Sequence, residues 1–423
     1  MVGQKPGDKA NSSASLKIFM LLPEPYNLDM PARPEVMEIY GNCFPRLGHK
    51  VTWVMPAKGN VKEIEEEAFG DVRIFTIPHY AGSFLPKRVF AKLVFLWKEE
   101  ELLGKIVKKG EKGGIIQVRN SVFEGILAIY LKRKFKIPFV FQYSFPGAEG
   151  SLWKYKSGSG KFYYLMARLV HFMLPFVMHR ANLILPISGG MMENLGNRGI
   201  PTTKMMALSM GVNIESFSPS VGAERVQAKY SLSDSKVIIY LGTMDRLRQL
   251  DMLIHSLAQL KWARQNVKLL MVGDGDGRNN LERLVCDLEL KNTVIFVGQV
   301  PYFEVPEFIA AADVAVSPVP PLDIYKVSSP CKLFEYMGIA KPVIANEEIP
   351  EHREVLEESG GGVLVPFTSE AFAQAIIELL DNPERAAEMG KRGREWVVKN
   401  RSYEILARQV EKRYRELIAI SSP

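Results

Sequence analysis

The chain has 423 residues, which is too many for one ordinary hydrophobic core, so two domains are the default expectation. An apolar content of 47% and a charged content of 24% match a globular protein, and no internal repeat or long low-complexity segment points to a fibrous or disordered class. The net charge of +7 is uneven. Residues 1–220 carry 29 basic and 18 acidic residues, or +11, whereas the remainder carries 25 and 29, or −4.

This charge asymmetry predicts an anionic partner for the first half of the chain. Nucleic acid is not expected, because the sequence contains no nucleic-acid-binding motif. An anionic lipid surface is the favoured partner, and an ordinary solvated lysine face is the open alternative. The basic residues of this half concentrate at Lys87 and Arg88, at 105–112 and at 132–136.

The first 14 residues are polar and small, which predicts a disordered tail, and they lack the apolar core of a signal peptide. The three cysteines, Cys43, Cys286 and Cys331, share no metal-type or redox-type spacing. The sequence therefore predicts no metal site and a cytoplasmic location, peripheral on the inner face of the cell membrane if the chain binds lipid.

After the tail, short apolar runs alternate with helical patterns. This alternation is typical of an α/β fold, in which a parallel sheet is covered by helices. In the first half, strands are expected at 17–22, 51–55, 115–118, 138–142 and 182–186, and helices at 35–47 and 122–134.

Residues 161–180 interrupt this alternation, because they are rich in aromatic residues and methionine. Their longest stretch without Lys, Arg or a terminal His, 169–178, has ten residues, about half of the roughly 20 that span a bilayer. The segment is consistent with an interfacial helix that contacts lipid or with a core helix of the first domain.

The alternation restarts after Pro219, which predicts two doubly wound Rossmann-like domains that face a central cleft at the carboxyl ends of their strands. The expected domains are 15–218 and 219–400, followed by a helical segment, 401–423, that packs back on the first domain. Strands are expected at 237–241, 268–272, 294–297, 314–317, 343–345 and 362–365, and helices at 250–260, 280–288, 305–311, 369–380 and 402–418.

Residues 328–345 are the most informative segment, because they combine a loop, a capped helix and a buried strand. Ser329 is the expected N-cap and Pro330 the expected first helical residue. The unpaired N–H groups at such a helix start attract a phosphate. Lys332 adds a full positive charge, and Glu335 can accept hydrogen bonds from hydroxyls. One helix could therefore hold both the diphosphate and the ribose of a nucleotide.

Several segments, in their order and spacing, resemble the retaining glycosyltransferases of family four, which have the GT-B architecture of two Rossmann-like domains. The resemblance covers nearly the whole length. The matching segments are 181–188, Met210 to Asn213 with Phe217 to Pro219, Tyr240 to Gly242 with Arg246 and Arg248, 270–275, Phe296 to Gly298, Ala312 with Asp313, and 329–345.

This resemblance implies transfer of a sugar from a nucleotide-sugar, with a UDP- or GDP-sugar as donor, to a hydroxyl of a glycan or lipid-linked acceptor in cell-surface glycan or glycolipid synthesis. It implies retention of configuration and no essential cofactor or metal. Arg248 and Lys332 match catalytic positions that neutralise the leaving diphosphate. The implied donor-binding residues are Gly242, Thr243, Arg246, Gly273, Gly275, Ser328, Ser329, Pro330, Cys331, Leu333 and Glu335, with Glu335 on the ribose.

The chain departs from the family pattern at four places. Val327 stands where many members have a second glutamate, eight residues before Glu335, and Thr243 replaces an arginine. Ser144 lies near the position of an expected histidine, and the first loop has Arg33 in place of a glycine-rich turn, so both are candidates for the acceptor side. These departures leave open a non-catalytic protein that binds a nucleotide or another transferase, and a nucleotide-sugar epimerase of similar architecture.

Overall fold

The computed structural model of the chain describes residues 15–26, 33–58, 61–78, 85–108, 114–147, 150–152, 161–263 and 266–421. The tail predicted at 1–14 lies outside the described residues. The chain divides into two compact units, Met1–Val140 with Glu411–Pro423, and Phe141–Val410. The domain boundaries expected from the sequence, after 218 and after 400, differ from the limits of these two units and stay predictions.

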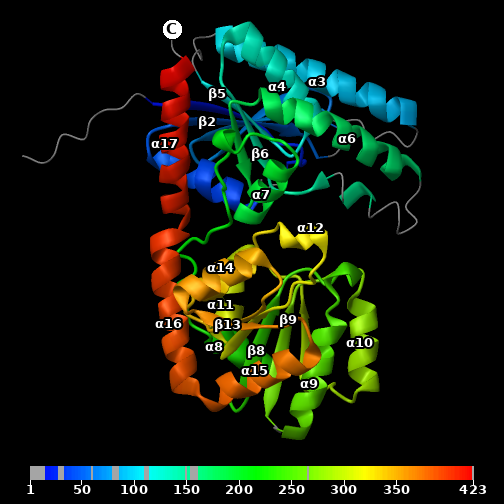
Figure 1. Cartoon of the computed structure of the whole chain (residues 1–423), viewed down its shortest axis with the longest axis vertical. Helices are drawn as coiled ribbons and strands as arrows, with labels where there is room; N and C mark the ends of the chain where they lie inside the picture. Colours follow the sequence, from blue (N-terminus) through cyan, green and yellow to red (C-terminus); the bar gives the residue numbers. More distant parts are fainter. Residues whose placement is uncertain are drawn as a thin grey trace, which may run out of the picture. The chain divides into compact units, whose positions relative to one another are not determined.

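A seven-stranded sheet contains the strands of the first half in the order β3-β4-β2-β1-β5-β6-β7 (Figure 1). β1 pairs in parallel with β2 and β5, and β2 pairs in parallel with β4. Every strand predicted in this half is present. The strands are β1 (Lys17–Leu21), β2 (Lys50–Pro56), β3 (Glu65–Phe69), β4 (Val72–Ile77), β5 (Ile115–Arg119), β6 (Phe139–Tyr143) and β7 (Leu183–Pro186).

The helices of this half include both helices that the sequence predicts. The helix expected at 35–47 is present as three consecutive pieces, and its middle piece is a π-helix. The helices are α1 (Pro34–Val36), η1 (Met37–Cys43), α2 (Phe44–Arg46), α3 (Leu85–Lys108), α4 (Val122–Phe135), α6 (Lys161–Arg180) and α7 (Gly189–Asn197), with a short turn of helix, η2 (Thr202–Lys204). Among the described helices, α6 included, none combines the length and the apolar character needed to cross a membrane.

Five elements of this half, β3, β4, α3, α7 and the short turn η2, are not among the predicted ones. β3 contains the acidic run Glu65, Glu66 and Glu67, a composition that disfavours strands. It forms because it pairs antiparallel with β4 at the edge of the sheet. Exposed charges on an edge strand also discourage pairing with another chain, so the acidic run is compatible with this position.

A six-stranded parallel sheet contains the strands of the second half in the order β10-β9-β8-β11-β12-β13. In chain order these strands read third, second, first, fourth, fifth and sixth, which is the Rossmann order. The predicted parallel α/β architecture is confirmed. The strands are β8 (Lys236–Leu241), β9 (Val267–Val272), β10 (Val294–Gly298), β11 (Val314–Ser317), β12 (Val343–Asn346) and β13 (Gly362–Val365).

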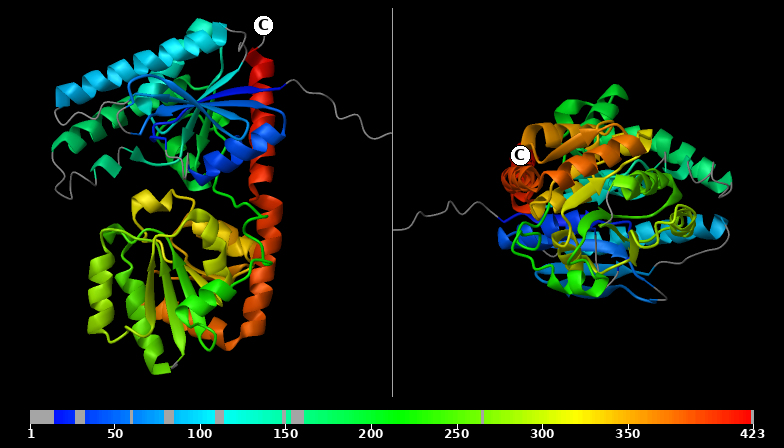
Figure 2. Two further views of the ribbon diagram at one scale, coloured as in Figure 1. Left: turned by 180° about the vertical axis from the view of Figure 1, so that it is seen from behind. Right: turned by 90° about the horizontal axis from the view of Figure 1, so that it is seen from below.

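Helices cover both faces of this second sheet (Figure 2). Consecutive residues of β8 alternate between two hydrophobic clusters, with Ile238 and Tyr240 in one and Val237 and Ile239 in the other. A strand buried on both faces needs a continuous apolar run, as the sequence provides here. The main helices are α8 (Glu224–Tyr230), α9 (Asp251–Ala263), α10 (Arg278–Asp287), α11 (Val305–Ala310), α12 (Asp323–Lys326), α13 (Cys331–Gly338), α14 (Pro350–Ser359) and α15 (Ser369–Asp381), with short turns η3 (Arg246–Arg248) and η4 (Tyr302–Glu304).

Two helices end the chain, α16 (Pro383–Asn400), which the sequence did not predict, and α17 (Tyr403–Ser421), expected at 402–418. The last part of α17 belongs to the same compact unit as β1, β2 and β5. There the Tyr414 hydroxyl donates a hydrogen bond to Gln117 and lies 3.2 Å from the Tyr40 hydroxyl.

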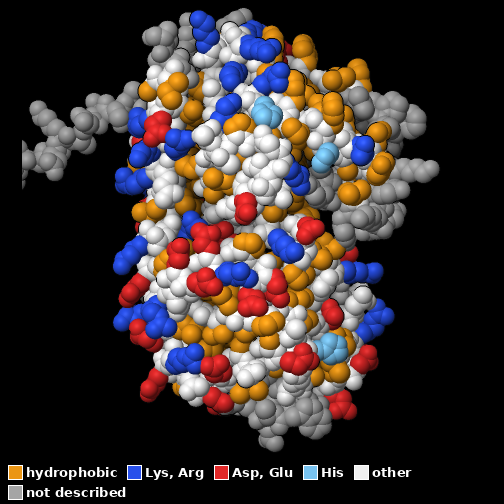
Figure 3. Space-filling model, viewed as in Figure 1, with side chains coloured by type: hydrophobic (Ala, Val, Ile, Leu, Met, Phe, Trp, Pro, Cys, Tyr) orange, Lys and Arg blue, Asp and Glu red, His pale blue; other side chains and the backbone are white. Residues whose placement is uncertain are grey.

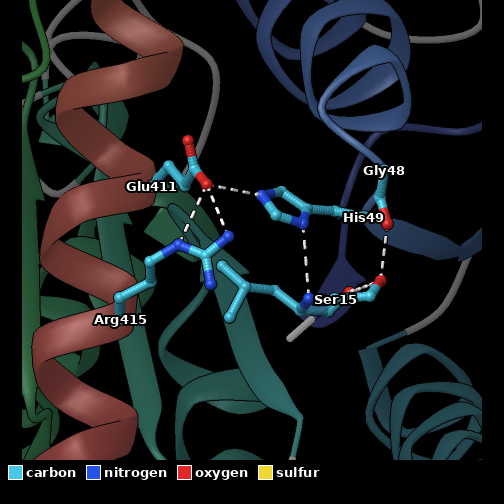
Figure 4. Close-up of polar contacts among 6 residues, drawn as sticks. Ser15, Gly48, His49, Glu411 and Arg415 are labelled. Atoms are coloured by element: carbon cyan, nitrogen blue, oxygen red, sulfur yellow. Dashed lines mark hydrogen bonds and ion pairs between the residues drawn. The ribbon is translucent and has the colours of Figure 1, made fainter. Parts of the chain in front are cut away.

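His49 joins the start of β1 to α17 (Figure 4). Its Nδ1 accepts a hydrogen bond from the Leu16 N–H at 3.3 Å, and its Nε2 lies 3.1 Å from the Glu411 carboxylate, which also accepts from Arg415. Burial lowers the pKa of His49, and the Glu411 charge opposes this shift. The folded protein therefore favours the neutral imidazole.

His49→Gln is expected to lower the free energy of unfolding by about 1–3 kcal/mol, because it leaves buried polar groups without a partner. Since the folded pKa of His49 lies below its ordinary value of 6.5, its contribution is present above that pH and is lost as the pH falls. Urea unfolding at pH values above and below 6.5 should show a free energy of unfolding that depends less on pH in the variant than in the wild type. The matched control is His255→Gln, which changes an exposed histidine; equal effects of the two variants would contradict the assignment.

Candidate functional site

The Rossmann strand order places the switch point of the second sheet between β8 and β11, where ligands bind at the carboxyl ends of the strands. A cavity of about 350 Å³ opens at this point, inside the unit Phe141–Val410. It is lined by the residues that follow β8, by the segment between β11 and α13 and by the start of α13, together with Ile187 and the segment after β6. The lining residues are Ser144, Phe145, Pro146, Ile187, Leu241, Gly242, Thr243, Arg248, Val319, Ile324, Tyr325, Val327, Ser328, Ser329, Pro330, Cys331, Lys332 and Glu335.

Two glycines allow the turns after β8 and β9 to approach each other. Gly242 and Gly273 have φ angles of 144° and 134°, a region that residues with a side chain rarely adopt. A Cβ atom on Gly273 would lie 2.0 Å from the carbonyl oxygen of Gly242. A Cβ atom on Gly242 would lie 3.1 Å from Lys332 Nζ. Gly273 therefore allows the two turns to approach each other, and Gly242 leaves room for Lys332 at the cavity.

Gly273→Ala is expected to destabilise the chain by more than the roughly 1–2 kcal/mol that a positive φ alone costs an alanine. The excess comes from the collision with the Gly242 backbone, which forces both turns to move. Urea unfolding measures the effect. Gly199→Ala is the matched control, because Gly199 has a φ of 84° and no atom within 4 Å of an added Cβ. Equal costs for the two variants would contradict the close approach.

The segment before α13 is held by hydrogen bonds to neighbouring elements. The Ser329 hydroxyl accepts from the Met210 N–H at 3.0 Å and donates to the buried Glu351 carboxylate at 2.9 Å. The Ser188 hydroxyl donates to the Val327 carbonyl at 2.8 Å. The expectation that Ser329 caps the helix is wrong. Pro330 is the N-cap, no side chain caps it, and the helix begins at Cys331.

Two cations face the cavity, and each lies over an aromatic ring. Lys332 Nζ is 4.0 Å from the ring centre of Tyr240, and the guanidinium of Arg248 is 4.5 Å from that of Tyr325. Arg248 Nε also donates to the Thr243 hydroxyl at 3.3 Å. Loss of hydration is the main cause that holds the pKa of Lys332 well below its usual range, and the positive charge of Arg248 is the second cause. An anion placed between these cations would relieve their repulsion.

Glu335 is the one acidic residue among the described residues that line the cavity. Its carboxylate accepts a hydrogen bond from the Tyr302 hydroxyl at 3.0 Å. Burial raises the pKa of Glu335 to about 7, while Tyr302 and the charge of Lys332 oppose the shift. Ionisation of this carboxyl near neutral pH is therefore costly unless hydrogen-bond donors are added.

The structure brings most of the predicted site residues together. The predicted residues that line the cavity are Gly242, Thr243, Arg248, Ser328, Ser329, Pro330, Cys331, Lys332, Glu335 and, from the candidate acceptor side, Ser144.

Five predicted site residues do not line this cavity. Leu333 points into the core of the second sheet, and Gly273 and Gly275 pack against neighbouring backbone. Arg246 lines another cavity of about 240 Å³, beside α9 and α10. Arg33 is an exposed residue that precedes α1 in the other compact unit.

Three tyrosines contact the predicted site residues, although the sequence analysis did not name them as part of the site. Tyr240 and Tyr325 lie under the two cations, and Tyr302 donates to Glu335. Tyr240 belongs to an apolar strand, and Tyr302 lies 33 residues before its partner. Their roles depend on contacts across the fold, so no local motif could identify them.

In the part of the chain that the structure describes, no group of three or more His, Cys, Asp or Glu side chains is placed to hold a metal ion. Among the described residues that line the cavity, the cations are those of Lys332 and Arg248.

Solved structures that superpose on nearly the whole chain establish the class of fold. Sucrose-phosphate synthase from Thermosynechococcus elongatus superposes with a TM-score of 0.71 over 96% of this chain and 100% of that chain, at 22% identity. HepE from Anabaena, solved in complex with UDP-glucose, gives a TM-score of 0.69 over 95% and 100%, at 16% identity. The chain has the GT-B fold, with two Rossmann-like sheets.

Residues 223–396, which include the second sheet and most of its helices, match the model of the family described as glycosyl transferases group 1. The matched residues contain nine of the ten predicted residues found at the cavity. Ser144, which precedes this region, is the exception.

The chain spans about half the length of the curated relatives that it matches. A GDP-mannose-dependent alpha-(1-6)-phosphatidylinositol monomannoside mannosyltransferase of Mycolicibacterium smegmatis is 30% identical over 205 residues, which cover 47% of this chain and 53% of the relative. A D-inositol 3-phosphate glycosyltransferase of Kineococcus radiotolerans is 27% identical over 212 residues, which cover 46% and 48%.

Proposed function

We propose that the chain is a glycosyltransferase that moves a sugar from a nucleotide-sugar to an acceptor hydroxyl with retention of configuration. The observation that carries this proposal is the pair of cations, Lys332 and Arg248, beside the start of α13 at the cavity of the second sheet. A leaving diphosphate gains negative charge as the sugar departs, and cations fixed in advance stabilise that charge.

The cavity suggests an orientation for the donor. The diphosphate would lie between Lys332, Arg248 and the N–H groups at the start of α13. Its ribose hydroxyls would donate to Glu335, and the sugar would extend toward Ser144 and Pro146, on another part of the cavity wall. In this arrangement the protein supplies charge and alignment, and no carboxylate nucleophile is assigned.

The donor class is a UDP- or GDP-sugar, and the acceptor class is a glycan or a lipid-linked sugar. Support comes from the names of the proteins to which this chain is similar, which include a GDP-mannose-dependent transferase and a structure with bound UDP-glucose. We place the protein at the cytoplasmic face of a membrane, because the charge of +11 over residues 1–220 favours an anionic surface.

The test is incubation of the purified chain with a panel of UDP- and GDP-sugars, with release of the free nucleotide as the readout. We expect hydrolysis or transfer with at least one donor. A non-catalytic binding protein is the second candidate, because Val327 lines the cavity where a second glutamate is often found in the family. Tight nucleotide binding without turnover of any donor, with lipid-linked acceptors included, would favour that candidate.

A further inference from the structure

Helix α6 has one face covered by large apolar side chains that are exposed. Phe172 and Leu165 are 82% and 57% exposed, and Tyr164, Leu169 and Phe176 are also exposed. Leu165, Leu169, Phe172 and Phe176 follow the helical spacing of three, four and seven positions, so they form one continuous stripe, and Tyr164 lies beside its first residue. We call this stripe, from Tyr164 to Phe176, the α6 face. Grouped exposed apolar side chains of this size mark an interaction surface.

The opposite side of α6 packs into the protein. Ala167, Leu174, Val177 and Met178 are buried there. The helix is therefore apolar on two sides, unlike an ordinary surface helix with one apolar and one polar side. Because buried residues already fix its position, the α6 face is an additional surface and is available to bind a partner.

The charged residues of α6 itself are of one sign. Residues 161–180 contain no Asp or Glu, whereas they include Arg168, Arg180 and two histidines. The guanidinium of Arg180 lies 3.7 Å from the ring centre of Phe176, and Lys204 donates to the carbonyl of His179 at 3.0 Å. Figure 3 shows hydrophobic side chains with blue and pale blue ones among them where α6 lies in Figure 1.

We infer that the α6 face lies in the headgroup region of an anionic lipid bilayer, parallel to its surface. Apolar side chains with flanking cations and no acids are the composition of helices that bind at this depth. A second copy of the chain is a poorer partner, because a two-fold contact would place the same cations against each other. This inference rests on the membrane location in the proposed function and names the helix responsible.

The experiment is flotation of the full chain with vesicles of phosphatidylcholine alone or mixed with phosphatidylglycerol, at low and high salt. Two variants test the face, Leu165→Ser with Phe172→Ser for its apolar part and Arg168→Glu for its charge. The matched control is Phe303→Ser, which removes a phenylalanine that is 80% exposed on η4. UDP binding by each variant reports on the nucleotide site separately.

We expect binding to the phosphatidylglycerol vesicles that weakens at high salt. The double serine variant should lose about tenfold or more in partitioning, since each apolar side chain contributes strongly to insertion. Arg168→Glu should also weaken binding, and Phe303→Ser should bind like the wild type.

Unchanged flotation of the double variant would overturn the role of α6 alone. Absence of vesicle binding with UDP binding intact would overturn the membrane location and leave the transferase proposal standing. A dimer in light scattering that the double variant abolishes would make a second copy the partner and overturn the inference.

Discussion

Lys332→Met is expected to slow donor turnover by about 100-fold or more, which is the typical effect of removing one fixed group that stabilises a developing negative charge. Lys332 is the cation of the cavity that belongs to α13 itself, and its Nζ would contact any side chain placed at Gly242. Burial, followed by the positive charge of Arg248, lowers the pKa of Lys332, and a bound diphosphate would oppose this shift and favour the charged amine. Its charge is therefore available to a bound diphosphate.

The same argument predicts that Lys332→Met does not weaken folding. Removing a cation that is poorly hydrated and close to Arg248 relieves repulsion, so the free energy of unfolding should stay the same or rise. Initial rates of nucleotide release, with urea unfolding of the same samples, measure both effects. Lys391→Met, at an exposed position of α16, is the control for loss of a lysine. Turnover of Lys332→Met at the wild-type rate would remove this residue from the mechanism.

Glu335→Gln is expected to raise the dissociation constant of UDP by about tenfold or more, because hydrogen bonds to a charged acceptor contribute about 1.5–3 kcal/mol each. The pH dependence should differ between the two proteins. Because the pKa of Glu335 is raised to about 7, the wild-type carboxyl takes up a proton as the pH falls through neutrality and accepts fewer ribose hydrogen bonds. The affinity of the wild type for UDP should therefore decrease as the pH is lowered below about 7, whereas the affinity of the variant should change little.

Stability should move in the opposite direction to binding. The folded pKa of Glu335 lies above its ordinary value of 4.5, so its contribution is fully present below pH 4.5 and is lost as the pH rises through about 7. Above that pH, Glu335→Gln should be more stable than the wild type, by up to about 3 kcal/mol. Calorimetric titrations and urea unfolding at several pH values test both signs. The control is Glu357→Gln at an exposed position of α14. A wild-type affinity that does not depend on pH would contradict the role of Glu335 on the ribose.

The sequence predicted the second sheet better than the first, for a physical reason. β8, β9, β11 and β12 are buried on both faces, so each reads as an apolar run that stands out from its surroundings. β3 depends on its antiparallel partner β4, and its glutamates give no local signal. The switch from α-helical to π-helical geometry in η1 likewise left no mark on the apolar pattern.

The candidate site was predicted where the residues follow one another along the chain. Ser328 to Lys332 and Glu335 belong to one loop and one helix, so their spacing alone placed them together. Tyr302 contacts Glu335 of that helix only through the fold. Tyr325 and Ser144 line the same cavity as the helix start, and Ser144 entered the prediction through the family resemblance alone. Arg246 and Arg248 are two residues apart on the same turn, η3, yet they line different cavities, which spacing cannot reveal.

The most direct test of the central claim is a crystal structure of the chain with bound UDP. We expect both phosphates within hydrogen-bond distance of Lys332 and the start of α13, with the ribose hydroxyls on Glu335. A nucleotide bound away from the start of α13, or a diphosphate that contacts neither Lys332 nor Arg248, would contradict the proposed site.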